Sequence, residues 1–395
     1  MHDMDRRHFV GACAAAVLAG CGPRSAPRRA APPTTLGACG GTPRLSLAPA
    51  ANETYFGVNL DWDHDSPATV ASRLGRGPAL YVAFAPFPLE GSAAGYIDSI
   101  AAGLVAQRAA LMLTLEPNDG LGSVTRASAG ALAGRAAAYN RDGVPVFLRF
   151  AHEMNGSWYA WGQQPTAYIE AFRTVAAAVH AAAPATAMVW APSYGGGYPF
   201  TGGKYAAQPG PAVAHLLDTD GDGTLSMHDD PYLPYYPGDD VVDWVGMSLY
   251  HWGSTYPWGN NQLPEPGKFT AMLTGTYKGT IGDQSMLPNF YDVYANRHGK
   301  PVAITETAAL YAPGKPGDEL AIKRAWWQQV FDPATLAMFP HLAMINWFEW
   351  DKYETEVSAE VDWAVIDEPS LARAFAASLP KSLLWAGAVP VCGGA

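Results

Sequence analysis

Eight short apolar runs, spread over residues 55–348, constrain the fold of this chain more than any other feature. They cover residues 55–59, 80–84, 111–115, 144–150, 187–191, 244–249, 302–305 and 343–348. Several are almost continuously apolar, as strands buried on both faces are. Alanine-rich stretches with helical spacing separate several of the runs, at 93–106, 127–139, 166–183 and 319–330. This alternation predicts an α/β fold, a single (β/α)8 TIM barrel over residues 51–385.

A doubly wound open sheet is the alternative with the same alternation of strands and helices. It is disfavoured because no glycine-rich phosphate loop follows the first run. The 395 residues suit one barrel, and 49% apolar with 15% charged residues excludes a disordered chain. The formal charge of −11 argues against a nucleic-acid partner and, more weakly, against strongly anionic polysaccharides.

Acidic and aromatic residues gather where the apolar runs end. In a (β/α)8 barrel the carboxyl ends of the strands form the active site. The residues found there are Glu116 after the third run, His152 and Glu153 after the fourth, Tyr250 and Trp252 after the sixth, Glu306 after the seventh, and Trp347 and Glu349 at the eighth. The sequence therefore predicts a site that combines carboxylic acids with aromatic rings.

Two of these acids have the placement that glycoside cleavage needs. Retaining hydrolysis uses an acid and a nucleophile whose carboxyl groups lie roughly 5–5.5 Å apart. The fourth and seventh runs face each other across a barrel mouth, so Glu153 and Glu306 can flank a bound sugar. We interpret Glu153 as the acid/base and Glu306 as the nucleophile.

Neighbouring residues would adjust both acids. His152, Trp158 and Trp161 can partly desolvate Glu153 and keep it protonated, and the rings can stack on sugars. Tyr250 and Arg149 are the candidates that would hold Glu306. A carboxylate at a strand end is often only a helix cap or an ion-pair partner. The 12% aromatic content can equally serve the core.

Four segments resemble glycoside hydrolase family 26, whose best-known members are endo-β-1,4-mannanases. The acid/base segment is HEMNGSWYAWG at 152–162; the others are 242–253, 300–307 and 345–351 with Asp362-Trp363. The resemblance runs from about residue 55 to 363. It implies a retaining (β/α)8 enzyme with Glu153 as acid/base and Glu306 as nucleophile, and a cleft lined by His152, Trp158, Tyr250 and Trp347. The substrate-binding residues that we predict are Arg149, His152, Trp158, Trp161, Glu116, Tyr250, Trp252 and Trp347.

Between the fifth and sixth runs lies a calcium-type loop, DTDGDGTLSMHD, at residues 218–229. Its spacing fits an EF-hand loop, with a glycine at position six and an Asp in place of the usual Glu at position twelve. The predicted ligands are Asp218, Asp220, Asp222, Thr224, Ser226 and Asp229. A polar surface turn is the plainer interpretation; we expect a structural Ca²⁺ and no organic cofactor. Neither H-E-x-x-H nor G-x-S-x-G occurs.

The first residues resemble an export signal. DRRHFV at 5–10 is similar to a twin-arginine signal, and LAGC at 18–21 is similar to a bacterial lipobox. We therefore expect a signal peptide over 1–20 and a lipidated Cys21. A proline- and alanine-rich tether would follow, over 21–50. The expected location is the bacterial cell envelope, with a membrane contact only through the lipid.

Of the four cysteines, Cys13 and Cys21 belong to these leader segments, which leaves Cys39 and Cys392. Export permits disulfides, and the two ends of a barrel lie close together. We predict a bridge between Cys39 and Cys392, which lies in the tail 386–395; two unpaired thiols are the alternative.

The expected function is retaining, endo-acting hydrolysis of β-1,4-mannan-type polysaccharide by a monomer. Mixed-linkage β-glucan, β-1,3-xylan or an exopolysaccharide would need the same chemistry. A surface carbohydrate-binding lipoprotein without activity is a second class, but a pure binder has no need of both Glu153 and Glu306.

Overall fold

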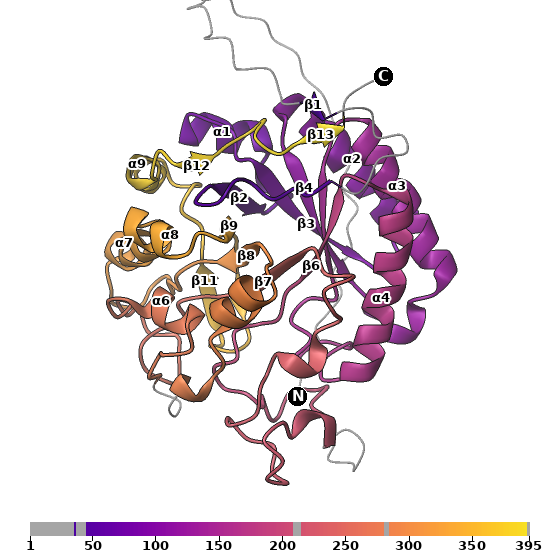
Figure 1. The fold of residues 1–395 in the computed structure, drawn as a ribbon. Helices are drawn as coiled ribbons and strands as arrows, with labels where there is room; N and C mark the ends of the chain where they lie inside the picture. The colour runs from indigo at the N-terminus through magenta and orange to yellow at the C-terminus, as the bar shows by residue number, and fades with distance from the viewer. Residues whose placement is uncertain (1–34, 37–44, 208–214, 280–283, 393–395) are drawn as a thin grey trace, which may run out of the picture. The chain divides into compact units, whose positions relative to one another are not determined.

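A closed barrel of parallel strands forms the centre of the computed structural model (Figure 1). The structure describes residues 35–36, 45–207, 215–279 and 284–392. The barrel strands are β2 Thr54–Leu60, β3 Leu80–Pro86, β4 Ala110–Glu116, β5 Val146–Phe150, β6 Thr186–Trp190, β7 Trp244–Ser248, β8 Val302–Thr307 and β9 Leu342–Glu349. Each pairs with the next, and β9 pairs back with β2, from Tyr55 opposite Met344 to Leu60 opposite Glu349. The predicted (β/α)8 barrel is thus confirmed, and the open sheet is excluded.

Helices surround the barrel in the connections between strands (Figure 1). The α-helices are α1 Pro67–Leu74, α2 Gly91–Gln107, α3 Arg126–Arg141, α4 Pro165–Ala182, α6 Lys268–Leu273, α7 Glu319–Val330, α8 Pro333–Met338 and α9 Pro369–Ser378. The 3-10 helices are η1 Leu121–Ser123, η2 Leu233–Tyr235 and η3 Gln284–Met286; η4 Tyr291–Arg297 is a π-helix. The four predicted helices occur within two residues of their expected ends. Among the described residues, no helix combines the length and the apolar character needed to cross a membrane.

Local sequence explains where several helices begin. The side chains of Ser66, Thr125 and Asp318 accept hydrogen bonds from backbone N–H groups in the first turns of α1, α3 and α7. Such caps satisfy amides that have no partner within the helix, and each stabilises the helix by about 1 kcal/mol.

Large side chains fill the barrel interior below its catalytic end. Phe147 packs edge-to-face on Trp244 at 5.2 Å between ring centroids, and Tyr55 lies 6.5 Å from Phe147. Side chains alternate between the two faces of a strand, so Arg149, two residues after Phe147, also points inward. The apolar filling therefore supports a buried charged residue from below.

A bulge near the end of β8 changes the direction of one side chain. Met247 pairs with Ile304 and Ser248 with Glu306, which leaves Thr305 as an extra residue in β8. The carbonyl oxygen of Thr305 accepts a hydrogen bond from Asn346 Nδ2 at 3.3 Å. Bulges of this kind commonly re-aim side chains near active sites. Here the bulge places Glu306 in register with Ser248.

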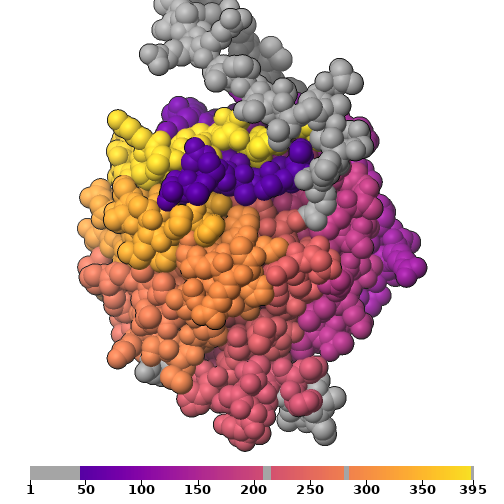
Figure 2. Space-filling model, in the orientation of Figure 1, coloured from indigo at the N-terminus to yellow at the C-terminus, as the bar shows by residue number. Residues whose placement is uncertain are grey.

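Both ends of the described chain add strands outside the barrel. The pair β1 Thr35–Leu36 and β13 Val391–Cys392 is parallel, and β12 Leu383–Leu384 extends the sheet beside β2. Figure 2 shows the yellow C-terminal segment lying along the indigo segment that begins the barrel unit. Leu47 is fully buried in a cluster with Val389. Residues 45–50 thus pack on the barrel, which corrects their assignment to the tether.

The predictions for the leader concern residues that the structure leaves undescribed. The signal peptide, Cys21 and the first part of the tether all lie outside the described residues, and so does Cys39. Cys392 is disulfide-bonded. In the β1–β13 pair, Cys392 lies opposite Leu36. Leu36 precedes Cys39 by three residues. The Cys39–Cys392 pairing stays a prediction, and the backbone register agrees with it.

Candidate active site

Glu306, at the end of β8, is held by a side chain from β5 and by one from the segment that follows β7. The hydroxyl of Tyr250 donates to Glu306 Oε2 at 2.6 Å, and Arg149 Nη1 donates to Glu306 Oε1. Arg149 is fully buried, and Glu306 is 7% exposed. A buried carboxylate is tolerated when a cation and hydrogen-bond donors compensate its charge. These two donors fix both oxygens and so define the direction in which the carboxylate points.

Ser248 connects the two catalytic candidates. Its hydroxyl accepts a hydrogen bond from Arg149 Nη2 at 2.7 Å and is also hydrogen-bonded to the carboxyl group of Glu153. Arg149 and Ser248 thus join Glu306 to Glu153 through one polar chain. Sequence reasoning missed Ser248, although a hydroxyl at the end of an otherwise apolar strand was a usable signal.

The backbone after β5 turns sharply and presents Glu153 to the mouth of the barrel. Ala151 and Glu153 both adopt left-handed conformations, with φ values of 46° and 53°. The N–H of Glu153 donates to Ala191 O at 2.9 Å, and Gly156 N donates to Glu153 O at 2.9 Å. Non-glycine residues in this region cost about 1–3 kcal/mol each, and the surrounding bonds must hold them there.

Gly156 allows Trp158 to reach Glu153. A Cβ at position 156 would lie 2.3 Å from the Trp158 ring, so only glycine leaves room for that ring. Trp158 Nε1 then donates to Glu153 Oε2 at 2.9 Å. Trp158 is 36% exposed and packs edge-to-face on Phe200. It therefore offers an open ring beside the acid.

The surroundings favour the protonated form of Glu153. Burial raises the pKa of this carboxyl, and the nearby charge of Glu306 raises it further. Arg149 and the hydrogen bonds from Ser248 and Trp158 act in the opposite direction. A carboxylic acid that keeps its proton toward neutral pH can act as a general acid.

His152 is a neutral partner in this group. Burial lowers its pKa well below the usual value, and the charge of Arg149 lowers it further. Its Nε2 lies 3.2 Å from the Tyr159 hydroxyl. Trp161 donates from Nε1 to His152 O at 2.7 Å and stacks on Tyr159 at 4.4 Å. Because Trp161 is fully buried, it supports His152, and the predicted contact with substrate is corrected.

Glu116 adds a third acid at the end of β4. Burial raises its pKa to about 7, and the charge of Glu306 contributes to that rise. Its protonated form therefore persists toward neutral pH, and in that form the carboxyl group can donate as well as accept a hydrogen bond.

Aromatic rings extend from Tyr250. Its ring lies 5.7 Å from Phe348 and 5.1 Å from Trp363, and Trp252 packs on Trp363 at 4.9 Å. Trp347 instead is fully buried and packs on Phe375 of α9 at 5.3 Å. Since neighbours in a strand face opposite ways, Phe348 faces Tyr250, and the prediction that Trp347 lines the cleft is corrected.

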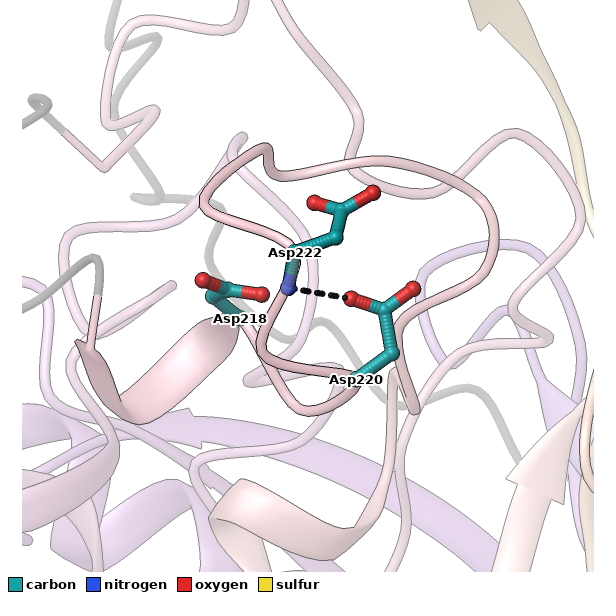
Figure 3. Close-up of side chains that lie close together, drawn as sticks. All are labelled: Asp218, Asp220 and Asp222. Atoms are coloured by element: carbon teal, nitrogen blue, oxygen red, sulfur yellow. Dashed lines mark hydrogen bonds between the residues drawn. The ribbon is translucent and has the colours of Figure 1, made fainter.

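The calcium-type loop lies between β6 and β7, and three of its acids come together. Carboxylate oxygens of Asp218, Asp220 and Asp222 lie within 4.8 Å of one another. Figure 3 shows them around one turn, where the N–H of Asp222 donates to Asp220 Oδ1 at 3.1 Å. Asp218 Oδ1 is buried without a hydrogen-bond partner among the described residues. An unpaired buried oxygen beside two further carboxylates fits a hard cation.

The other predicted ligands have different contacts. Asp229 is 1% exposed, and its oxygens accept from the backbone N–H groups of Thr219 at 2.6 Å and Ser226 at 2.8 Å. Ser226 Oγ accepts from His228 N at 3.1 Å, and Thr224 N donates to Asp222 Oδ1 at 2.7 Å. Asp229 therefore braces the loop through backbone hydrogen bonds, and its role as a ligand stays a prediction.

A protein-family model matches the part of the chain that carries several of these residues. The model of glycosyl hydrolase family 26 matches residues 113–217, a segment that contains Glu116, Arg149 and Glu153. Endoglucanase H of Acetivibrio thermocellus is 24% identical over 240 residues, which are 59% of this chain and 20% of that protein. The chain thus spans about one fifth of the length of that relative.

Solved structures share the fold. A modular endo-β-1,4-mannanase from Cellulomonas fimi has a TM-score of 0.53 and 16% identity, over 87% of this chain and 75% of that one. Cel5A of Thermotoga maritima, in complex with mannotriose, has a TM-score of 0.50 and 10% identity, over 84% and 98% of the two chains. Likenesses at such low identity show the barrel architecture alone.

Proposed function

We propose that this chain belongs to glycosyl hydrolase family 26 and is a retaining enzyme that cleaves β-1,4-mannan-type polysaccharide within the chain. The match of residues 113–217 to the model of that family supports this proposal. Glycoside hydrolysis is the activity that this match supports. One observation carries the finer proposal: Glu306 is paired with buried Arg149 and bonded to Tyr250, while Glu153 is set to keep a proton. The matched segment ends before Tyr250, so the role of Glu306 rests on this geometry.

In the proposed first step, Glu306 attacks the anomeric carbon of the bound sugar. A bond forms between a Glu306 oxygen and that carbon as the glycosidic bond breaks. Glu153 donates its proton to the departing oxygen, so the leaving chain departs as a neutral alcohol. Arg149 and Tyr250 hold the carboxylate in line, which restricts the nucleophile to one geometry.

In the second step, Glu153 is ionised and takes a proton from water. The water oxygen bonds to the anomeric carbon, and the bond to Glu306 breaks. Two inversions at one carbon return the starting configuration, so the product is the β-anomer. Glu153 ends protonated and Glu306 ends as a carboxylate, so the site is ready for another turnover.

The substrate class rests on relatives. The structural neighbour from Cellulomonas fimi is an endo-β-1,4-mannanase, and this supports mannan as the first candidate. The relative from Acetivibrio thermocellus is an endoglucanase, which makes β-glucan the second candidate. Both polymers have β-linked hexopyranose units whose apolar faces suit open rings such as Trp158.

Reducing-sugar release from a panel of glycans tests the proposal. We expect the full chain to cleave linear mannan and galactomannan, with weaker or no cleavage of mixed-linkage β-glucan and β-1,3-xylan. Cleavage of β-glucan alone would support the proposed hydrolysis and contradict mannan as the substrate. Binding without any cleavage would favour the inactive surface binder and overturn the enzyme.

We also propose that Ca²⁺ binds the loop at residues 218–229. Its support is the grouping of Asp218, Asp220 and Asp222 and the unpaired Asp218 Oδ1. Hard cations such as Ca²⁺ take carboxylate, carbonyl and water oxygens. A bound ion would offset the repulsion among three nearby carboxylates, and its role would be structural.

Calcium removal should then lower thermal stability. An ion at 100 times its dissociation constant stabilises the folded state by about 2.7 kcal/mol, which corresponds to a fall in Tm on the order of 5 °C on chelation. Differential scanning calorimetry with EDTA, and then with excess Ca²⁺, measures this. Asp220→Asn with Asp222→Asn should remove the response, and Asp142→Asn should keep it. An unchanged Tm in the parent protein would overturn the calcium proposal.

A further inference from the structure

We propose that the loop between β7 and α6 carries an additional sugar subsite, in which the rings of Trp258 and Tyr256 bind hexose units of the substrate beyond those held at the catalytic acids. This proposal rests on the proposed function and extends it to the length of glycan that the cleft holds. We call this pair of rings the aromatic platform.

The aromatic platform is continuous with the catalytic centre. Tyr250, which bonds to Glu306, lies 6.2 Å from Trp252 between ring centroids. Trp252 lies 6.3 Å from Trp258, and Trp258 lies 5.2 Å from Tyr256. Four rings therefore lead from the nucleophile to the surface. A glycan that leaves the catalytic centre along these rings would meet an aromatic surface at each step.

The outer rings of this series are accessible. Tyr256 is 58% exposed, and Trp258 and Trp252 are partly exposed. Aromatic side chains contribute most of their binding energy when a ligand covers them, and exposed rings joined to a polar site mark binding surfaces. Sugars present apolar C–H faces and polar edges, so a stacked hexose can keep its hydroxyl groups in water.

A buried polar cluster fixes the base of the loop. Lys268 Nζ, 4% exposed, donates to Gly253 O at 2.8 Å and lies 3.3 Å from His251 Nδ1. Burial lowers the pKa of His251 to about 4, so its ring is neutral. With Nδ1 facing the ammonium group, the proton is on Nε2, which donates to Gln262 O at 2.8 Å.

Side-chain amides fix the rest of the loop. Gln262 Oε1 accepts from Ser254 N at 2.8 Å and from Thr255 N at 3.0 Å, immediately before Tyr256. Asn261 exchanges two hydrogen bonds with Ala312, at 3.0 Å and 2.7 Å. The loop is thus held on both sides of its rings. Rings that are already ordered lose little entropy when a ligand binds, and this makes the aromatic platform suitable for weakly attractive sugars.

The charge of the loop favours a neutral ligand. Between Gly253 and Leu263 the loop has no charged side chain, and its polar groups are hydroxyls and amides such as Asn260. Amides and rings together are the groups that bind uncharged hexoses, whereas an anionic glycan would need basic residues. Neutral β-linked hexose units are therefore the ligand that this surface fits.

Oligosaccharide binding to a nucleophile-disabled protein tests the aromatic platform. The parent is Glu306→Gln, and calorimetry measures Kd for mannobiose, mannohexaose, cellobiose and cellohexaose. Adding Tyr256→Ala with Trp258→Ala should weaken binding of the hexaose that the parent prefers by about tenfold. The disaccharide should lose less than twofold. Met338→Ala, an exposed apolar residue on α8 (60% exposed), is the matched control.

The outcomes separate the two proposals. An equal loss of affinity for hexaose and disaccharide would indicate damage to the catalytic centre. Unchanged affinity for the hexaose would show that the rings do not bind it. Either result overturns the aromatic platform. If neither hexaose binds the parent, the proposed function fails first, and the aromatic platform fails with it. Tyr256→Ala alone removes only the most exposed ring and should weaken hexaose binding by a few-fold without lowering Tm. This single variant keeps the test valid if the double variant unfolds.

Discussion

Replacement of Glu306 by alanine should lower kcat on the polysaccharide at least about 10⁴-fold. In the proposed first step a bond forms to this carboxylate, and no other group is held by both Arg149 and Tyr250 in the described part of the chain. Azide can enter the space left by the carboxylate and attack from the same side. With an aryl β-mannobioside, the product would be the α-glycosyl azide, which NMR identifies.

Stability must be separated from chemistry in this variant. Glu306→Ala leaves the guanidinium of Arg149 buried and unpaired, which typically costs about 3–5 kcal/mol. Glu306→Gln offers an amide oxygen to the same donors and should lose as much activity with a smaller fall in Tm. Glu360→Ala, on an exposed carboxylate of β11 Ala359–Asp362, should behave as the native protein. Activity of Glu306→Gln within tenfold of the native value would refute the assignment of the nucleophile.

Replacement of Glu153 by glutamine should lower kcat on polysaccharide by about 10²–10⁴-fold. The amide oxygen can still accept the hydrogen bond from Trp158, but the amide has no acidic proton to donate to the departing oxygen. An aryl glycoside with an acidic phenol leaves without that proton, so its first step should change far less. Comparing the two substrate types by steady-state and burst kinetics measures this difference.

The pH profile provides a second test of Glu153. Burial and the Glu306 charge raise its pKa, so the protonated acid persists to higher pH than in a free glutamate. The rate falls as pH rises through that raised pKa, and kcat/KM should show an alkaline limb. Glu153→Gln should remove the limb on aryl substrates. If the alkaline limb survives in Glu153→Gln, a group other than Glu153 causes it. Glu116, with a pKa of about 7, is then the next candidate.

The order of strands and helices could be predicted from the sequence because its signals are local. Apolar runs and alanine-rich spacing depend on neighbouring residues only, and they located the barrel strands and four helices. The candidate acids could also be predicted from the sequence, because the active site of a barrel lies at the carboxyl ends of its strands. Glu153 and Glu306 follow directly from that rule.

Side-chain direction needed the tertiary structure. Trp161 and Trp347 are buried supports, whereas Phe348 faces Tyr250. A shift of one residue in a strand reverses the face that a side chain occupies, and pairing with distant strands decides that shift.

The same reason applies to the acids themselves. The bulge at Thr305 that sets the register of Glu306 depends on β7 and β9, and Asp229 turned toward backbone amides of its own loop. The residue types that a glycosidase needs were readable from the chain itself. Which of them face one another was decided by contacts between residues far apart in sequence, because only those contacts set strand register and burial.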